Sequence, residues 1–500
     1  MTFWNVARGT VCAAALLIAA PAVADVTPAQ VWDEWQTMLA ISGEGSLTFD
    51  NATETGGVLT VTNARIAGDS DESSFDIGLG DIAFTDQGDG TVRVTMASSY
   101  PMTITGADGT VVNLALSQTE LVIIASGAPG ALTYDVAADT YRINIEEVME
   151  NGTPAFDGEL AVTLNDLTGT YTVNGTADRN IDYALASASV DLLADVTTPE
   201  NNGNFVMSGQ ISALRAAAQV VLPEGFNMSD PSAFSQAGFD FDGNYGYDSA
   251  TYVINSAADG EDTAIAMTTG TGDVGVAMSA AELTYDVAVE GISADITSSS
   301  APFPVTISLA RYGFGLAMPA QATEEPAAFG LRLELSDLAV NDEVWMMGDP
   351  TNALSHDPIT LRLDLAGTAK LLFDLFNPDE TAAMAEGEAP GELHSLTLND
   401  LTLNAVGASV TGTGEFTFDN SDMTTFNGFP RPEGSATFDL IGVNKVIDGL
   451  ISMGVLPQDQ AMMGRMMMGM FAQTVGDDHL KSTIEVTGDG RVLANGQQIR

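Results

Sequence analysis

The feature that most constrains the fold is a two-residue alternation of apolar and polar side chains. In residues 331–335, Leu331, Leu333 and Leu335 alternate with Arg332 and Glu334. This period places the two sets on opposite faces of a β-strand, with the apolar face against a core and the polar face toward water. The pattern recurs at residues 92–96, 141–145, 283–289, 305–309 and 361–365. It predicts a mostly β protein of long antiparallel meander sheets, and a curved or groove-forming sheet is one form that it allows.

A few segments have helical spacing instead. Thr27 suits an N-cap and Pro28 a first helical position, and Trp32 and Trp35 belong to one apolar stripe that follows. We therefore expect an N-terminal helix and a Met-rich C-terminal helical region. The C-terminal region comprises 443–453 and then 458–474 after Pro457, and two shorter segments with a helical pattern are a turn after Pro231 and 342–347.

The first residues have the pattern of an export signal. Arg8 precedes an apolar run at 11–18, and the small-residue box that ends in Ala22 and Ala24 comes before Asp25. This order is typical of a secretory signal cleaved before Asp25, and the run is too short to span a membrane. The only cysteine, Cys12, lies inside it. We therefore expect a periplasmic protein that has no disulfide and no integral membrane anchor after cleavage.

The chain is strongly acidic, with a formal net charge of -52. Such a surface repels nucleic acid and anionic headgroups, so nucleic-acid binding is excluded as a function class. The charge is compatible with binding of cations or basic partners, and equally with solubility alone. We favour solubility because the carboxylates are scattered and do not form long acidic runs.

Groups suited to catalysis are scarce. The three histidines, His356, His394 and His479, have no second His or Cys at metal-ligand spacing, and the chain contains neither H-E-x-x-H nor G-x-S-x-G. The residues therefore favour a non-enzymatic protein without a cofactor. A hydrolase whose site is assembled from distant segments stays open as an alternative.

One segment has the oxygen spacing of a calcium loop, with Asp240, Asp242 and Asn244 at every second residue. The sixth position of such a loop requires glycine, and here it is Tyr245. The twelfth requires a bidentate glutamate, and here it is Thr251. A hairpin turn is the favoured interpretation, with a metal site as the alternative.

Methionines crowd the last helical segment. Two interpretations stay open: an apolar groove that accepts a lipid or peptide, and a core stripe in which methionines fill gaps against a sheet, which we favour. Trp32 and Trp35 are treated in the same way, as core anchors or as part of a binding surface. The candidate ligand-binding residues are Met462, Met463, Met466, Met467, Met470, Phe471, Trp32 and Trp35.

The chain after residue 24 is expected to form a single β-rich module at 25–500. Residues 43–52 and 412–421 are identical at six of ten positions. Such a repeat allows a division into two halves, at about 25–255 and 256–500. Chance similarity between two β-patterns explains the identity equally well.

Three stretches resemble an exported alphaproteobacterial family, domain-of-unknown-function family 2125. They are residues 25–45, which begin DVTPAQVWDEW, residues 331–375, which include NDEVWMMGDP, and residues 450–500, in which the Met-rich helix precedes a final hairpin. The resemblance covers the whole chain after the signal and implies no catalytic residue. The β-rich build is also similar to AsmA-like envelope proteins, some of which carry lipids along a β-groove, although this chain has no anchor after cleavage.

Three functions follow as hypotheses. The leading one is a non-enzymatic periplasmic protein that binds a lipid or another apolar ligand in envelope maintenance. The second is an acidic scaffold for basic partners or calcium, and the third is the hydrolase with a dispersed site. The oligomeric state is not predicted.

Overall fold

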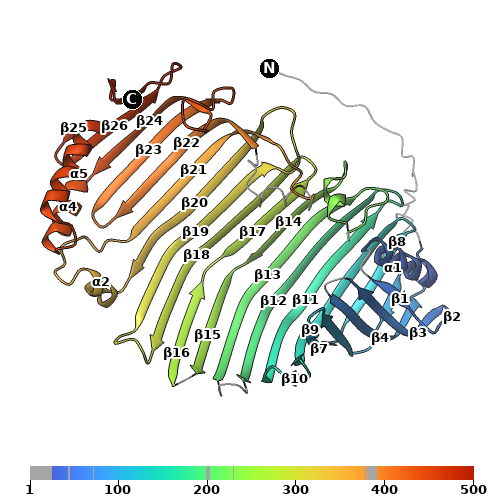
Figure 1. The fold of residues 1–500 in the computed structure, drawn as a ribbon. Coiled ribbons are helices and arrows are strands. Elements are labelled where there is room, and N and C mark those ends of the chain that lie inside the picture. The colour runs from blue at the N-terminus through green and yellow to red at the C-terminus, as the bar shows by residue number, and fades with distance from the viewer. Residues whose placement is uncertain are drawn as a thin grey trace, which may run out of the picture.

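The computed structural model describes residues 25–42, 45–70, 73–198, 203–228, 230–258, 260–377, 380 and 391–500. The predicted export signal and its residues Ala22 and Ala24 lie outside these ranges. The described residues form one antiparallel sheet of 28 strands, in which most strands pair with their neighbours in sequence. Figure 1 shows it as a long twisted band that runs from blue at the N-terminal end to red at the C-terminal end. The predicted mostly β, antiparallel fold is thus confirmed.

The N-terminal end of the sheet combines short strands with the longer β3 and β4. They are β1 (Ser46–Thr48), β2 (Asn51–Thr55), β3 (Val58–Asp69), β4 (Ser73–Asp86), β5 (Val92–Thr95), β6 (Ser99–Gly106), β7 (Val111–Thr119) and β8 (Val122–Ala128). Several long strands here pair with two short ones end to end, as β4 does with β5 and β6.

The middle of the sheet contains the longest strands, of up to 20 residues, together with several shorter ones. They are β9 (Ala131–Glu150), β10 (Thr153–Pro154), β11 (Asp157–Asn174), β12 (Arg179–Thr198), β13 (Gly203–Leu222), β14 (Asp240–Tyr247), β15 (Ser249–Ala258), β16 (Glu261–Thr269), β17 (Gly272–Ser279), β18 (Glu282–Ser298), β19 (Val305–Pro319), β20 (Ala327–Val340) and β21 (Ile359–Leu371).

The C-terminal end completes the sheet. Its strands are β22 (Gly391–Ala405), β23 (Ala408–Asp419), β24 (Arg431–Ile441), β25 (Gln473–Gly476), β26 (His479–Val486), β27 (Val492–Ala494) and β28 (Gln497–Gln498). Within the described ranges, the helices are α1 (Pro28–Ser42), η1 (Pro231–Ser235), α2 (Asp342–Gly348), α4 (Val443–Ser452) and α5 (Gln458–Phe471).

The helical segments were predicted correctly to within a few residues. The exception is the end of α5, which stops at Phe471 because the residues from Gln473 onward pair as β25 with β26. The predicted hairpin turn at Asp240 is wrong. Residues 240–247 form strand β14, which pairs with β13 on one side and β17 on the other, so tertiary pairing overrides the local turn signal.

A band of backbone irregularities crosses the middle strands. The backbone has positive φ at Asp166, Ala213, Gly291 and Asp337, and the cross-strand pairing is interrupted at each of these places. Between β20 and β21 the register also shifts by one residue there, as in a β-bulge. In β12 the apolar residues change from odd to even numbers between Leu185 and Val190, on either side of the interruption.

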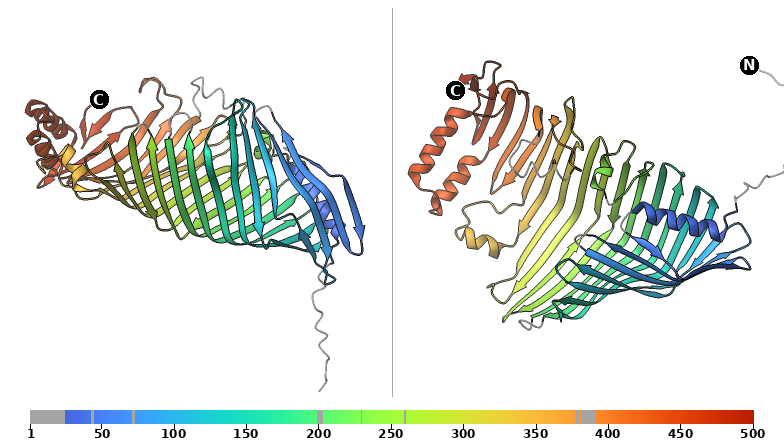
Figure 2. Two further views of the ribbon diagram at one scale, coloured as in Figure 1. Left: turned by 90° about the horizontal axis from the view of Figure 1, so that it is seen from below. Right: turned by 45° about the vertical axis from the view of Figure 1, so that its right-hand side comes forward.

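The two ends of the sheet differ in shape. Figure 2 shows the first strands turning back over α1, so that the helix lies between them and the face of the strands that follow. The main core is here: Val31 of α1 and Val61, Ile82 and Phe84 of β3 and β4 are fully buried. We call this part, formed by the first strands β1–β8 around α1, the rolled end. It closes one end of the apolar face.

The similar decapeptides at 43–52 and 412–421 differ in structure. The described part of the first contains the short strand β1 and the start of β2, with a break between them, whereas most of the second lies inside the single strand β23.

Candidate apolar ligand site

A cavity of about 440 Å³ lies between α1 and the rolled end of the sheet. Its walls come from α1, β1, β3, β4, β8, β9 and β11. They consist mainly of apolar side chains: Trp32, Trp35, Met38, Leu39, Leu47, Ile66, Leu79, Ile82, Ile123, Tyr134, Val136 and Tyr171, together with the acidic Glu34. A concave, mostly apolar space with few polar groups is the usual form of a small-molecule site.

The apolar stripe of α1 builds one wall of this cavity. Trp32 and Trp35 both pack on Phe84, with ring centroids 5.7 and 5.3 Å apart, and Trp32 also meets Phe49 edge to face. Trp32 is 5% exposed and Trp35 is partly buried against the same core. Their predicted role as core anchors is confirmed, and both rings also line the cavity.

A buried ion pair fastens α1 to the sheet. The Arg179 guanidinium of β12 donates to the Glu34 carboxylate of α1, and the two side chains are only 8% and 12% exposed. The same guanidinium nitrogen lies 3.4 Å from the Met38 sulfur. Glu34 and Arg179 are 145 positions apart, so sequence reasoning could not pair them.

Two tyrosines supply polar atoms beside this pair. Burial raises the pKa of Tyr171 to about 12, and the nearby Glu34 carboxylate adds to the rise. Burial and Glu34 also raise the pKa of Tyr134. Both phenols therefore stay protonated at neutral pH and are able to donate. The Tyr134 hydroxyl is buried beside the Trp35 side chain, whose indole N–H can only donate, and its own proton has no acceptor, which is uncommon in folded proteins.

A row of apolar positions leads from this cavity across the sheet. Each member is the direct cross-strand partner of the next. We call this set the apolar row: Tyr134, Tyr171, Tyr183, Ala218, Gly243, Val276, Tyr285, Leu316, Leu331, Leu365, Leu398, Gly414, Ala436 and Ile484. Thirteen strand-to-strand steps of about 4.8 Å make it about 60 Å long.

The apolar row is open in its middle and distal part. Tyr285 is 39% exposed, and Leu316, Leu331, Leu365 and Leu398 are all only half-buried. The expectation that each apolar face packs against a core is therefore wrong for these strands. Alternation reports which side chains share a face, whereas whether another layer covers that face depends on the rest of the chain. A large exposed apolar surface usually marks a site of interaction.

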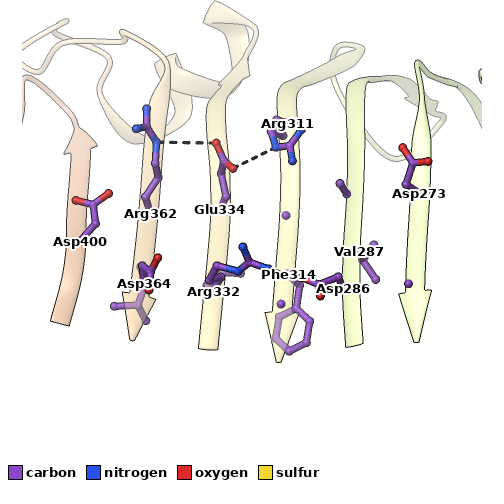
Figure 3. A pocket seen from close by; sticks show the side chains of 16 residues that line it. Asp273, Asp286, Val287, Arg311, Phe314, Arg332, Glu334, Arg362, Asp364 and Asp400 are labelled. Carbon is purple, nitrogen blue, oxygen red and sulfur yellow. Dashed lines mark hydrogen bonds and ion pairs between the residues drawn. The ribbon is translucent and has the colours of Figure 1, made fainter. Parts of the chain in front are cut away.

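The opposite face carries a second hollow, of about 420 Å³, which is charged (Figure 3). Glu334 lies between two arginines, with Arg311 Nε 3.1 Å and Arg362 Nε 3.9 Å from its carboxylate oxygens. Arg332 pairs with Asp286 at 2.5 Å. The charged side chains of this hollow are largely paired with one another across strands. Fewer of them are therefore available to bind an ionic ligand than the composition of the hollow suggests.

The methionine stripe of α5 does not line the cavity. Met462, Met463, Met466, Met467 and Met470 are 53–65% exposed, while Ala461 is buried and Met468 is half-buried on the opposite side of the helix. The favoured interpretation of this stripe as core is therefore wrong. Phe471 is half-buried, and its carbonyl accepts hydrogen bonds from Ser482 and Asn495. These residues lie at the opposite end of the sheet from Trp32 and Trp35 (Figure 1).

The weak metal candidates are strand residues. Asp240, Asp242 and Asn244 project from one face of β14 at intervals of about 7 Å, whereas a calcium loop curls around its ion. Within the described ranges, no cluster of three or more His, Cys, Asp or Glu side chains is placed to hold a metal ion.

The three histidines lie beside carboxylates. The closest pair is His479 Nε2 and Asp439 Oδ1, at 2.8 Å. His356 Nε2 is 3.5 Å from Asp349 and His394 Nε2 is 3.6 Å from Glu392, so the polar group that each nitrogen faces is a carboxylate at the outer limit of hydrogen-bond length. A nucleophile activated by histidine requires a hydroxyl or thiol within hydrogen-bond reach of the ring. These two nitrogens therefore do not form such a pair.

Sequence reasoning found the two tryptophans of the cavity and missed Glu34, Tyr134 and Tyr171. It also missed the apolar row. The signal for this row was the alternation itself, which places the apolar residues of successive strands on one face of the sheet. Among the described residues, no helix is long and apolar enough to cross a membrane.

Comparison with known proteins identifies a family for this chain but no activity. No curated protein matches the chain. One family matches residues 195–495, a range that begins within β12 and leaves out α1 and the rolled end. Since this range is more than half of the sequence, the chain belongs to the family described as uncharacterized protein conserved in bacteria (DUF2125).

Proposed function

We propose that this protein holds the acyl chain of a lipid on the apolar face of its sheet, with the cavity beneath α1 as the closed end of the path. The observation that carries this proposal is the apolar row, which begins in the cavity wall at Tyr134 and Tyr171 and continues without a charged residue to β26.

The dimensions fit such a ligand. The cavity volume of about 440 Å³ lies within the range of small-molecule sites. The path of about 60 Å is much longer than one acyl chain, so the face has room for several chains or for movement of one along it. Each methylene transferred from water to this face contributes about 0.8 kcal/mol, which supports binding without a specific headgroup contact.

The charge of the chain constrains the headgroup. A net charge of -52 repels anionic lipids, so zwitterionic or neutral lipids are the better ligands. The Tyr134 hydroxyl is a free donor for an ester carbonyl or a lipid hydroxyl that enters the cavity. The export signal predicted for residues 2–24 supports a periplasmic place of action.

Photocrosslinking from adjacent positions tests the proposal. The crosslinking amino acid p-benzoylphenylalanine replaces Leu331 on the apolar row or, as the matched control, Arg332 on the opposite face. The full chain is then irradiated with vesicles of the zwitterionic lipid phosphatidylethanolamine. We expect the mass of a lipid adduct at position 331 and little at position 332. Equal labelling of both positions, or none at position 331, contradicts the proposal.

A further inference from the structure

The exposed face of α5 consists mainly of methionine. At 100° per residue, Met462, Met463, Met466, Met467 and Met470 fall within 140° of the helix circumference, and each is more than half exposed. Asp459 lies on the same face one turn earlier. We call these five methionines the methionine face.

Five exposed methionines gather on this one helix, whereas the other strongly exposed methionines, such as Met346 and Met347 of α2, occur singly or as a pair. The apolar row contains leucine, tyrosine, valine, isoleucine, alanine and glycine but no methionine. Leucine and methionine have nearly equal helix propensity, so helix formation does not require methionine on α5. What methionine adds to an exposed apolar face is a polarisable thioether sulfur.

Four of the sulfurs belong to a compact arrangement. Met463, Met466, Met467 and Met470 form a lozenge in which each residue has two neighbours three or four positions away. Side chains at these spacings are neighbours on a helix, with Cβ atoms about 5–6 Å apart. The three rotatable bonds of methionine allow neighbouring sulfurs to converge above the helix.

The surroundings favour a cation. The basic residue of this helix, Arg465, is turned away toward α4, where its Nη2 lies 2.6 Å from Asp448 and its Nε donates to Asn444. Asp459 instead adds a negative charge to the methionine face. No thiol ligand competes on the described surface, since the only cysteine of the chain is Cys12.

We propose that the methionine face is a binding site for Cu(I), held by three of the four sulfurs of the lozenge. Thioethers are soft ligands that select Cu(I) over the harder divalent metals. The methionine face lies at the opposite end of the sheet from the cavity, so this site is independent of the proposed lipid function.

Titration of Cu(I) against a chromogenic chelator tests the site. Anaerobic Cu(I), kept reduced with ascorbate, is partitioned between bicinchoninate and the full chain. The test variant M463L/M466L/M467L/M470L keeps the apolar surface and the helix propensity but removes the four sulfurs. The control variant M228L/M346L/M347L/M423L removes four exposed methionines elsewhere on the molecule. Circular dichroism shows whether each variant is folded.

We expect the parent and the control variant to take Cu(I) from the chelator, and the α5 variant to bind it at least tenfold more weakly. The methyl carbon resonances of the α5 methionines should shift on Cu(I) addition in the parent. Unchanged affinity in the α5 variant, an equal loss in the control variant, or no uptake by the parent overturns the proposal. Leucine preserves an apolar docking surface, so a loss in the α5 variant also separates coordination from docking.

Discussion

The ion pair between Glu34 and Arg179 is predicted to control the docking of α1. Substituting either residue leaves the other charge buried in an apolar setting. Removal of one partner of a buried pair typically costs about 3–5 kcal/mol. The side chains are 12% and 8% exposed, so solvent screening takes little from this range. We therefore expect E34L and R179M each to lower the free energy of unfolding by about 4 kcal/mol, which is about a thousandfold in the equilibrium.

The double variant E34L/R179M separates this effect from a loss of packing. It removes both charges and replaces them with apolar side chains of similar volume, a change that is often neutral or stabilising for a buried pair. We therefore expect the double variant to be more stable than either single variant. The cycle of four proteins then gives a coupling energy of at least about 3 kcal/mol between the two side chains.

Urea unfolding followed by tryptophan fluorescence measures these differences. The chain has four tryptophans, and a W4F/W345F background leaves Trp32 and Trp35 of α1 as the reporters. A loss below about 1 kcal/mol in E34L, the range of exposed ion pairs, would refute the reasoning. Additive losses in the double variant would refute it as well, since they show that the two charges do not depend on each other.

Three further outcomes are expected in the same unfolding assay. Y134F removes a buried hydroxyl whose proton has no acceptor, so it should raise the free energy of unfolding by about 1 kcal/mol, and a loss of that size would contradict the assignment. G414A places a Cβ 2.6 Å from the Ala436 side chain on the neighbouring strand β24. This contact should lower the free energy of unfolding by about 1–3 kcal/mol. An unchanged urea midpoint would show that the two strands move apart without cost. The Ser421 hydroxyl and the Arg431 guanidinium lower the pKa of Asp419 to about 2 from its ordinary 3.8. The stabilisation that Asp419 contributes is then complete above pH 3.8 and is lost as the pH falls through about 2. The difference in free energy of unfolding between the parent and D419N should therefore decrease as the pH is lowered across this window. A gap independent of pH would contradict it.

The local elements could be predicted from the sequence because their signals are local. Thr27 and Pro28 mark the start of α1, and Pro457 precedes α5, as observed. The alternation at 331–335 is likewise a strand of one antiparallel sheet. These signals depend on the backbone preferences of a few adjacent residues, so they survive folding.

The site could be predicted only in part because it depends on contacts between distant segments. Trp32 and Trp35 were found through their own helix, but their partner Phe84 lies on another element. The stripe at Met466 was expected to be core, since periodicity shows that side chains share a face and not what that face meets. The turn expected at Asp240 failed for the same reason, because pairing with β13 and β17 decides that segment.

The acidity and the open apolar face are consistent with each other. A sheet that exposes a row from Tyr285 to Leu398 risks self-association through that face. The same strands place charged residues such as Glu334 and Asp286 on the other face, and the whole chain carries a net charge of -52. At low salt two copies repel each other before their apolar faces can meet, while a zwitterionic or neutral lipid approaches without this penalty. For the proposed lipid function, this charge therefore acts as a form of selectivity, since it favours a zwitterionic or neutral lipid over a second copy of the chain as the partner of the apolar row.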